Sequence, residues 1–145
     1  MRNWGDDMNI LLYLLPKAEV EFIYDDFTIR QALEKMEYHQ YSTIPVISRK
    51  GKYVGSISEG DLLWEIKRHR LNLEICEKKP IANITPHKKI APISADKNMS
   101  DIVDIIINQN FVPVVDDRDN FIGIVTRKSV INYLTNELNK RNNNL

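Results

Sequence analysis

The stretch that decides the fold is TIPVISRKGKYVGSISEGDLL, residues 43–63. It predicts a strand from Ile44 to Ile47, a polar turn, a second strand from Tyr53 to Ile57 and a helix that begins at Glu59. Gly51 supports the turn, because glycine adopts the positive φ that closes such a loop at no steric cost. The stretch is therefore predicted to be a β-hairpin followed by a helix.

The same pattern occurs a second time, 68 residues later, as FVPVVDDRDNFIGIVTRKSVI, residues 111–131. The two stretches align without a gap, so that Pro113 falls on Pro45 and Gly123 falls on Gly55. Apolar positions stay apolar throughout the alignment. An internal repeat of this length indicates that two similar supersecondary units build the chain.

Two copies of an x-h-P-V-h, turn, h-h-G-h-h-[ST] pattern resemble a tandem pair of CBS (cystathionine β-synthase) domains, as found in small stand-alone bacterial proteins. The resemblance covers roughly residues 8–138. It implies an α/β fold of two β-α-β-β-α repeats related by pseudo-two-fold symmetry, with short sheets packed together and helices outside. It also implies a regulatory module that binds an adenosine-containing ligand between its repeats, usually as a dimer.

The chain is predicted to divide into four parts. They are repeat 1 with a lead-in (8–70), a basic connector with a second lead-in (71–89), repeat 2 (90–140) and a disordered tail (141–145). Residues 8–15 are expected to pack on the first repeat, and residues 80–84 to lead into the second. The connector is expected to be a solvated, flexible surface, with phosphate or partner binding as the alternative. Residues 1–7 show no pattern, which suggests Met8 as the true start.

Short strands are predicted at residues 20–24 and 90–95, and the helices follow from apolar periodicity. Thr28 and Gln31 have the spacing of a capping box and predict a helix from Ile29. The side chains predicted to face the core from the successive helices are Ile29, Ala32, Leu33, Met36; Leu62, Leu63, Ile66; Met99, Ile102, Val103, Ile106; and Val130, Ile131, Leu134, Leu138. Ile105 and Ile107 make the third helix apolar almost all round, which predicts deep burial. The last helix is expected to run from Arg127 to Lys140.

Composition excludes several classes of protein. Twenty basic residues balance twenty acidic ones, so no overall field favours nucleic acid or an anionic membrane. Cys76 is the only cysteine, which excludes an internal disulfide and fits a reducing compartment. The apolar run Ile10–Leu15 is far shorter than the ~20 residues that span a bilayer, and no basic segment precedes it. A cytoplasmic protein is expected.

Catalysis and metal binding find little support in the sequence. His39, His69 and His87 have no partner at metal-ligand spacing, and no nucleophile-elbow glycine pattern accompanies the serines. We expect no metal site, no required cofactor and no enzymatic activity.

Ser58 and Asp61 form the most informative pair, because they lie at a predicted strand-to-helix junction. Their spacing is that of an N-cap and its reciprocal partner. The same geometry suits a nucleotide, since free N–H groups at a helix start favour phosphate and a carboxylate can accept from two ribose hydroxyls. The resemblance implies the second role.

The second repeat departs from this pattern. Thr126 keeps the hydroxyl, but Ser129 stands where Asp61 stands in the first repeat. Arg127 and Lys128 add two cations next to the expected phosphate position. We therefore expect one good site at Asp61 and one altered or empty site.

The resemblance also implies that each site takes its base-binding residues from the other repeat. The Asp61 site would use Ile93, Ser94, Asn110, Phe111, Val112 and Pro113; the Thr126 site would use Ile23, Tyr24, Thr43, Ile44 and Pro45. The alternative is that the apolar members of both sets are plain core residues.

These observations lead to one expected function and its alternatives. The chain is expected to bind an adenine nucleotide (AMP, ADP or ATP) as a regulatory ligand in the cleft between its repeats, as a homodimer that signals to an unknown effector protein. Alternatives are S-adenosylmethionine or cyclic di-AMP in the same cleft, or a structural dimerisation module with a vestigial pocket. Glu59 is expected to restrict the Asp61 site to adenosine or AMP.

Overall fold

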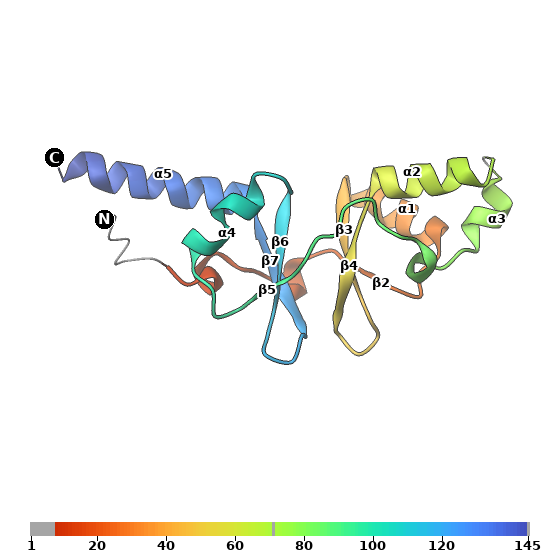
Figure 1. Ribbon diagram of the computed structural model, residues 1–145, viewed down its shortest axis with the longest axis horizontal. Coiled ribbons are helices and arrows are strands. Elements are labelled where there is room, and N and C mark those ends of the chain that lie inside the picture. Colours follow the sequence, from red (N-terminus) through yellow and green to blue (C-terminus); the bar gives the residue numbers. More distant parts are fainter. Residues whose placement is uncertain (1–7, 71, 145) are drawn as a thin grey trace. The chain divides into compact units, whose positions relative to one another are not determined.

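The protein is described by a computed structural model that covers residues 8–70 and 72–144 (Figure 1). The suggested start after residues 1–7 lies outside the described residues. The chain forms two compact units. The first-repeat unit comprises Glu21–Ala91 and Asp119–Phe121, and the second-repeat unit comprises the chain up to Val20, Pro92–Arg118 and the chain from Ile122. Both units combine helices with a short sheet, which confirms the predicted α/β fold of two repeats.

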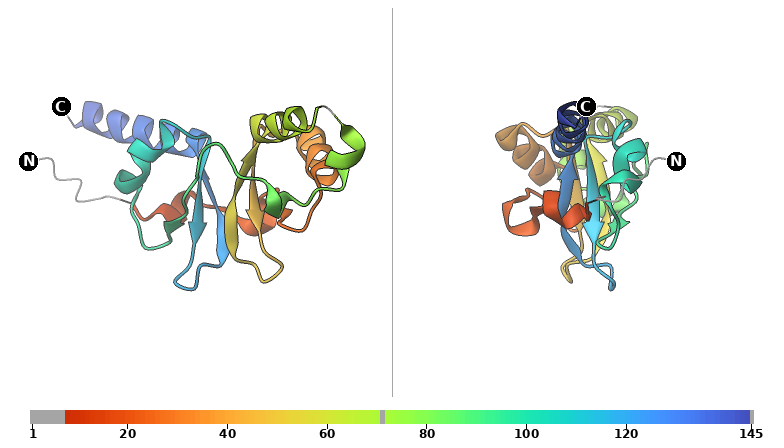
Figure 2. Two further views of the ribbon diagram at one scale, coloured as in Figure 1. Left: turned by 45° about the vertical axis from the view of Figure 1, so that its right-hand side comes forward. Right: turned by 90° about the vertical axis from the view of Figure 1, so that its left-hand side faces the viewer.

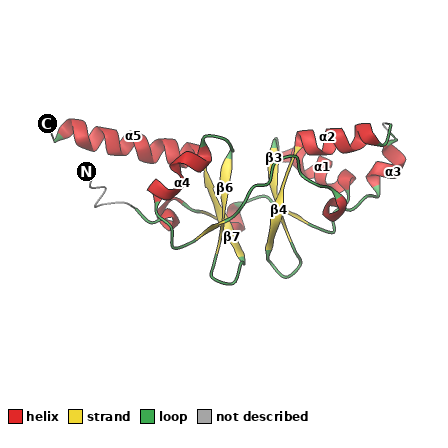
Figure 3. Ribbon diagram, viewed as in Figure 1, coloured by secondary structure: helices red, strands yellow, loops and turns green. Residues whose placement is uncertain are grey.

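The first-repeat unit has a three-stranded sheet in the order β2-β3-β4. Its strands are β2 (Ile23–Tyr24), β3 (Thr43–Ile47) and β4 (Tyr53–Ser58), and its helices are α1 (Ile29–His39), α2 (Glu59–Arg68) and α3 (Leu73–Glu77). Strand β2 is parallel to β3, whereas β3 and β4 form the predicted antiparallel hairpin. Figure 3 shows α1 and α2 next to each other beside this sheet. Their core combines Ile44, Val46 and Ile57 from the strands with Met36 and Leu62 from the helices.

Local signals in the sequence account for the ends of these elements. Thr28 caps α1 and forms the predicted capping box with Gln31. Gly51 has a φ of 83°, as the hairpin turn requires. Because Ile44 pairs with Ile57 across the ladder, these two side chains lie on the same face of the sheet, toward the core.

The second-repeat unit has a four-stranded sheet in the order β1-β7-β6-β5. Its elements are β1 (Leu15–Pro16), β5 (Ile93–Ser94), α4 (Met99–Ile106), β6 (Phe111–Val115), β7 (Phe121–Thr126) and α5 (Arg127–Asn143). Its core is built from α4, α5 and the strands around Ile102, Val112, Val125, Val130 and Tyr133. The helix α5 continues to Asn143, three residues beyond its predicted end at Lys140, so the prediction of a disordered tail was wrong for residues 141–143.

The N-terminal lead-in does not pack on the first repeat, as the sequence had suggested, but on the second. Ile10 is fully buried in the core of the second-repeat unit. The Met99 N–H donates to the Met8 carbonyl at 2.7 Å, and Leu15 pairs with Ile124 of β7. Figure 2 shows this red segment alongside the second repeat. The apolar character of the lead-in predicts that it is buried, but it does not predict in which of the two similar cores. Periodicity alone therefore could not show on which repeat the lead-in packs.

The second lead-in, residues 80–84, also packs on the other repeat than the one predicted. Ile81 and Ile84 belong to the core of the first-repeat unit, not the second. The Ile81 N–H donates to the Phe27 carbonyl at 2.7 Å, and the Ile29 N–H donates to the Lys79 carbonyl at 3.0 Å. The connector therefore contains ordered structure that the sequence did not predict, including α3 and a 3₁₀ helix over Ile81–Asn83.

Several side chains predicted to be buried are exposed. They are Leu33, Leu63, Ile105, Ile107, Ile131 and Leu138. Each helix buries only the narrow stripe that meets its own sheet, represented by Met36, Leu62 and Ile102, and the adjoining apolar positions face outward. The two short strands are also shorter than predicted, since only Ile23–Tyr24 and Ile93–Ser94 pair.

Candidate functional site

Asp61 lies in the first turn of α2, directly after β4. The Ser58 Oγ accepts from the Asp61 N–H at 3.1 Å, and the Asp61 Oδ2 accepts from the Ser58 N–H at 2.9 Å. These two bonds form a complete capping box. The capping role that the spacing predicts is thus confirmed, and one carboxylate oxygen of Asp61 is already used by it.

The other oxygen of Asp61 also has a partner within the first-repeat unit. The His87 N–H donates to Asp61 Oδ1 at 2.8 Å, and the Asp61 residue is only 7% exposed. Each carboxylate oxygen has two lone pairs, so each retains the capacity for one further hydrogen bond. Both oxygens of Asp61 are therefore engaged within the first-repeat unit, and little of the carboxylate is exposed.

Both repeats hold their second helix against the start of a strand with the same bond. The Glu59 N–H donates to the Ser42 carbonyl, and the Arg127 N–H donates to the Asn110 carbonyl, each at 2.9 Å. In the first-repeat unit Thr43 pairs directly with Ser58. Thr43 to Pro45, which are predicted to serve the Thr126 site, therefore begin next to Ser58, the N-cap residue of α2.

In the second repeat, the residues at the start of α5 bond to one another and to α4. The Thr126 Oγ1 accepts from the Ser129 N–H at 3.1 Å and donates to the Ser129 Oγ at 3.0 Å. The Arg127 Nε donates to the Ile106 carbonyl at 3.2 Å, at the C-terminal end of α4. A cation is favourable at a helix C-terminus. Arg127 therefore has a structural partner, which the phosphate hypothesis did not include.

The predicted base-binding residues differ in how accessible they are. Ile44 and Val112 are fully buried core residues, and Ile23, Pro45, Phe111 and Pro113 are also buried. Thr43, Ile93 and Ser94 are half-buried, while Asn110 is exposed. The guanidinium of Arg49 lies 3.8 Å from the centroid of the Tyr24 ring. Since each predicted site draws residues from both units, its assembly stays a prediction.

An ion-pair network around the buried Glu65 of α2 was missed by the sequence analysis. Glu65 is 5% exposed, and its carboxylate accepts from Lys79 Nζ, from His69 Nε2 at 3.1 Å and from Arg68 Nη1 at 3.1 Å. The hydrogen bond from Lys79 is the main cause that holds the pKa of Glu65 below its ordinary value of 4.5. Lys79 belongs to the connector that had been interpreted as solvated. The available signal was Glu65 itself, which lies between Leu62 and Ile66 on the inner side of the helix.

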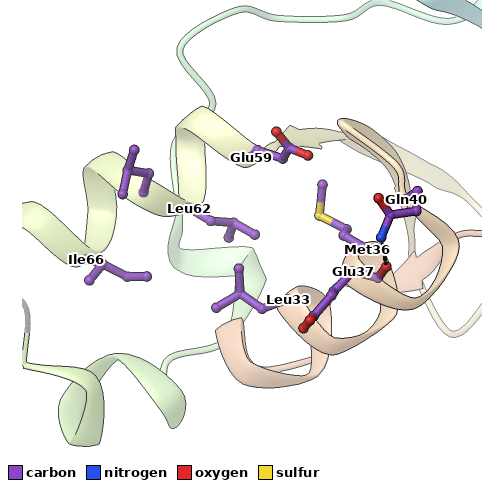
Figure 4. Close-up of a pocket in the computed structure, with 8 residues that line it drawn as sticks. Leu33, Met36, Glu37, Gln40, Glu59, Leu62 and Ile66 are labelled. Carbon is purple, nitrogen blue, oxygen red and sulfur yellow. Dashed lines mark hydrogen bonds between the residues drawn. The ribbon is translucent and has the colours of Figure 1, made fainter.

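An open groove of about 500 Å³ lies between α1 and α2 (Figure 4). Its lining is mainly apolar and consists of Leu33, Met36, Glu37, Gln40, Glu59, Leu62, Leu63 and Ile66. Figure 4 shows Glu37, Gln40 and Glu59 toward one end and Ile66 toward the other. The groove thus combines an apolar floor with an acidic end.

The described part of the chain contains neither a candidate metal cluster nor a candidate membrane-spanning helix. No group of three or more His, Cys, Asp or Glu side chains there could hold a metal ion. Among the same residues, no helix combines the length and the apolar character needed to cross a bilayer.

Known proteins resemble the chain in sequence and structure. An uncharacterised protein of Methanocaldococcus jannaschii is 26% identical over 141 residues, which cover 77% of this chain and 84% of that protein. The crystal structure of CbpB in complex with c-di-AMP is 25% identical, has a TM-score of 0.82 and covers 94% of this chain and 91% of that one. The crystal structure of CbpB from Streptococcus agalactiae is 26% identical, with a TM-score of 0.79, and covers 92% and 84%.

The family match agrees with the internal repeat. The model of the CBS domain matches the chain twice, at residues 14–68 and 81–136, which together make up well over half of it. The first match contains a hairpin and the helix that follows it, and the second contains a hairpin and the first part of α5. The chain therefore belongs to the CBS domain family.

Proposed function

We propose that this chain is a regulatory module that binds an adenine nucleotide and has no catalytic activity of its own. The observation that carries the proposal is the Ser58–Asp61 pair at the junction of β4 and α2, in a chain made almost entirely of two CBS repeats. A helix start favours a phosphate group, and the carboxylate of Asp61 can accept from two ribose hydroxyls. Further support comes from CbpB, a similar protein crystallised with c-di-AMP.

Asp61→Ala should weaken nucleotide binding more than Ser129→Ala. Only the carboxylate can accept from both hydroxyls, and loss of such a charge-assisted contact costs roughly 1.5–3 kcal/mol. Titration calorimetry with AMP and with cyclic di-AMP measures both variants. Asp101→Ala is the matched control, because it removes the same capping contact from α4, where Asp101 Oδ2 accepts from the Asn98 N–H at 2.9 Å. Equal losses at positions 61 and 129 would refute the asymmetric site.

Two ligands are distinguished by their phosphates. Cyclic di-AMP is favoured by the likeness to CbpB. AMP is favoured by Glu59, which occupies the first position of α2 and repels additional phosphates there. A thermal-shift panel that includes AMP, ATP, cyclic di-AMP and S-adenosylmethionine ranks the candidates, since a ligand at 100 times its Kd adds ~2.7 kcal/mol of stability. A panel without any shift would favour the structural dimerisation module.

A second copy of the chain is the occupant that we propose for the groove between α1 and α2. Leu33 and Leu63 expose apolar surface along the groove. The acidic end with Glu37 and Glu59 is complementary in charge to Arg127 and Lys128 at the start of α5, which a second copy supplies. Apolar surface with complementary charges at its rim is typical of an interface.

Leu63→Lys should convert the homodimer into a monomer. Leu63 is 54% exposed and lines the groove, so a lysine there places a charge at the centre of the proposed interface without disturbing the core. Light scattering at micromolar concentration gives the mass of each species, and the monomer is 16.9 kDa. Tyr38→Lys, on the same helix as Leu33 but outside the groove, is the control and should stay dimeric. A monomeric unmodified protein would contradict the proposal.

A further inference from the structure

The connector crosses the site residue Asp61 as a strap, which we define as residues 85–91. It follows Ile84, which is buried in the core of the first-repeat unit. It contains no helix or strand, and the side chains of Thr85, His87, Lys88 and Lys89 are exposed. Pro86 and Ile90 are half-buried, so the strap lies against the unit without forming part of its buried core.

Two hydrogen bonds connect the strap to the hairpin and to α2. The His87 N–H donates to Asp61 Oδ1 at 2.8 Å. The Tyr53 Oη donates to the Ile90 carbonyl at 2.8 Å, and it also lies 2.7 Å from Ser56 Oγ. Both bonds lie within the first-repeat unit. A segment without regular structure that is attached through such bonds can separate from its unit without unfolding the core.

We propose that the strap is an autoinhibitory contact that nucleotide must displace. The proposal rests on the proposed role of Asp61 in binding ribose. Because Asp61 is only 7% exposed and each of its oxygens already accepts one backbone N–H, a ribose diol gains access to the carboxylate when the strap withdraws and the His87 N–H leaves Oδ1. The strap therefore opens when nucleotide binds, and its release changes the exposed basic surface of His87, Lys88 and Lys89. That change is what an effector protein would detect.

Amide hydrogen exchange measured by NMR tests the opening directly. In the free protein the His87 amide should be protected by its bond to Asp61. Saturating AMP or cyclic di-AMP should accelerate its exchange at least tenfold. The Ala82 amide, which donates to the Asp25 carbonyl at 3.0 Å in the same unit, is the control and should not accelerate. A His87 amide that stays protected in the bound protein would overturn the strap.

Tyr53→Phe tests the same proposal by affinity. It removes the hydroxyl that holds Ile90, so opening costs less and nucleotide should bind about fivefold more tightly, as expected for one lost hydrogen bond. Tyr38→Phe removes an exposed hydroxyl and should leave the affinity unchanged.

The outcomes separate the strap from the proposed function. Nucleotide that binds with an unchanged His87 amide and an unchanged Tyr53→Phe affinity refutes the strap alone. Binding that is seen only in Tyr53→Phe supports a strap that is closed in the unmodified protein. No binding to either protein refutes the proposed function and the strap with it.

Discussion

Gly123→Ala should lower the free energy of unfolding by about 4 kcal/mol, among the largest single-residue effects expected in this chain. A Cβ at this position would lie 2.2 Å from the Leu15 carbonyl oxygen and 3.0 Å from a Leu14 methyl carbon. Gly123 also has a φ of 155°, which side-chain-bearing residues rarely adopt. Relief would require β1 to leave β7, where Pro16 pairs with Gly123. Urea unfolding followed by circular dichroism measures the loss.

Gly55→Ala is the matched control, because Gly55 occupies the same position in the first repeat. No atom outside its immediate neighbours lies within 4 Å of a Cβ built there. We expect a change below about 1 kcal/mol, since the space is open and alanine narrows the unfolded ensemble. If both variants lose the same free energy of unfolding, then Leu14 and Leu15 do not lie as close to Gly123 as the structure shows.

These two glycines show what the sequence could and could not predict about the fold. The repeat, the hairpins and the capping box of α1 depend on residues close in sequence, and all three were predicted correctly. The repeat makes Gly55 and Gly123 equivalent. They differ because Leu15 of the lead-in lies next to Gly123 and not next to Gly55. Which core a lead-in joins depends on contacts between residues far apart in the chain, and the local sequence does not reveal these contacts.

The candidate site was predictable to a similar extent. Ser58 and Asp61 follow from the repeat and from capping geometry, and the structure confirms their contact. The bond from His87 to Asp61 involves a backbone N–H, which every residue except proline possesses, so residue identity gives no sign of it. The burial of Glu65 was missed for a different reason. Its partner Lys79 lies 14 residues later in the sequence, after α3. The basic composition of the connector gave no sign that this segment folds back onto α2.

The network around Glu65 leads to a second prediction of a large effect on stability. Its members connect α2 to the start of the second lead-in. Lys79 bonds to Glu65 through its side chain and to Ile29 of α1 through its carbonyl. The pair therefore fixes the connector where it enters the first core. A buried carboxylate that loses its main cation retains its desolvation cost with less of the attraction that offset it.

Lys79→Met should accordingly lower the free energy of unfolding at neutral pH by about 3 kcal/mol. Arg30→Met is the matched control. It also removes a cation from a pair with glutamate on a helix, but Arg30 and Glu34 are 62% and 65% exposed. Such surface pairs contribute about 0.5 kcal/mol or less. Urea unfolding of both variants at pH 7 makes the comparison.

The pH dependence identifies Glu65 as the source of the effect. Its pKa is lower in the folded chain than the ordinary 4.5, so the ionised carboxylate stabilises the fold above that value. That contribution should disappear as the pH falls through the folded pKa. Removal of Lys79, the main cause of the shift, should therefore flatten the loss of stability below about pH 4.5. Arg68 and His69 also face the carboxylate and should preserve part of the slope.

A double variant separates the charge from the packing. Replacement of both Glu65 and Lys79 by methionine removes the buried charge together with its partner and retains the volume of both side chains. Stability at pH 7 should return to within about 1 kcal/mol of the unmodified protein, because apolar replacement of a buried pair is often neutral. If the double variant is as unstable as Lys79→Met, the lysine acts through its packing against the connector and not through the charge of Glu65.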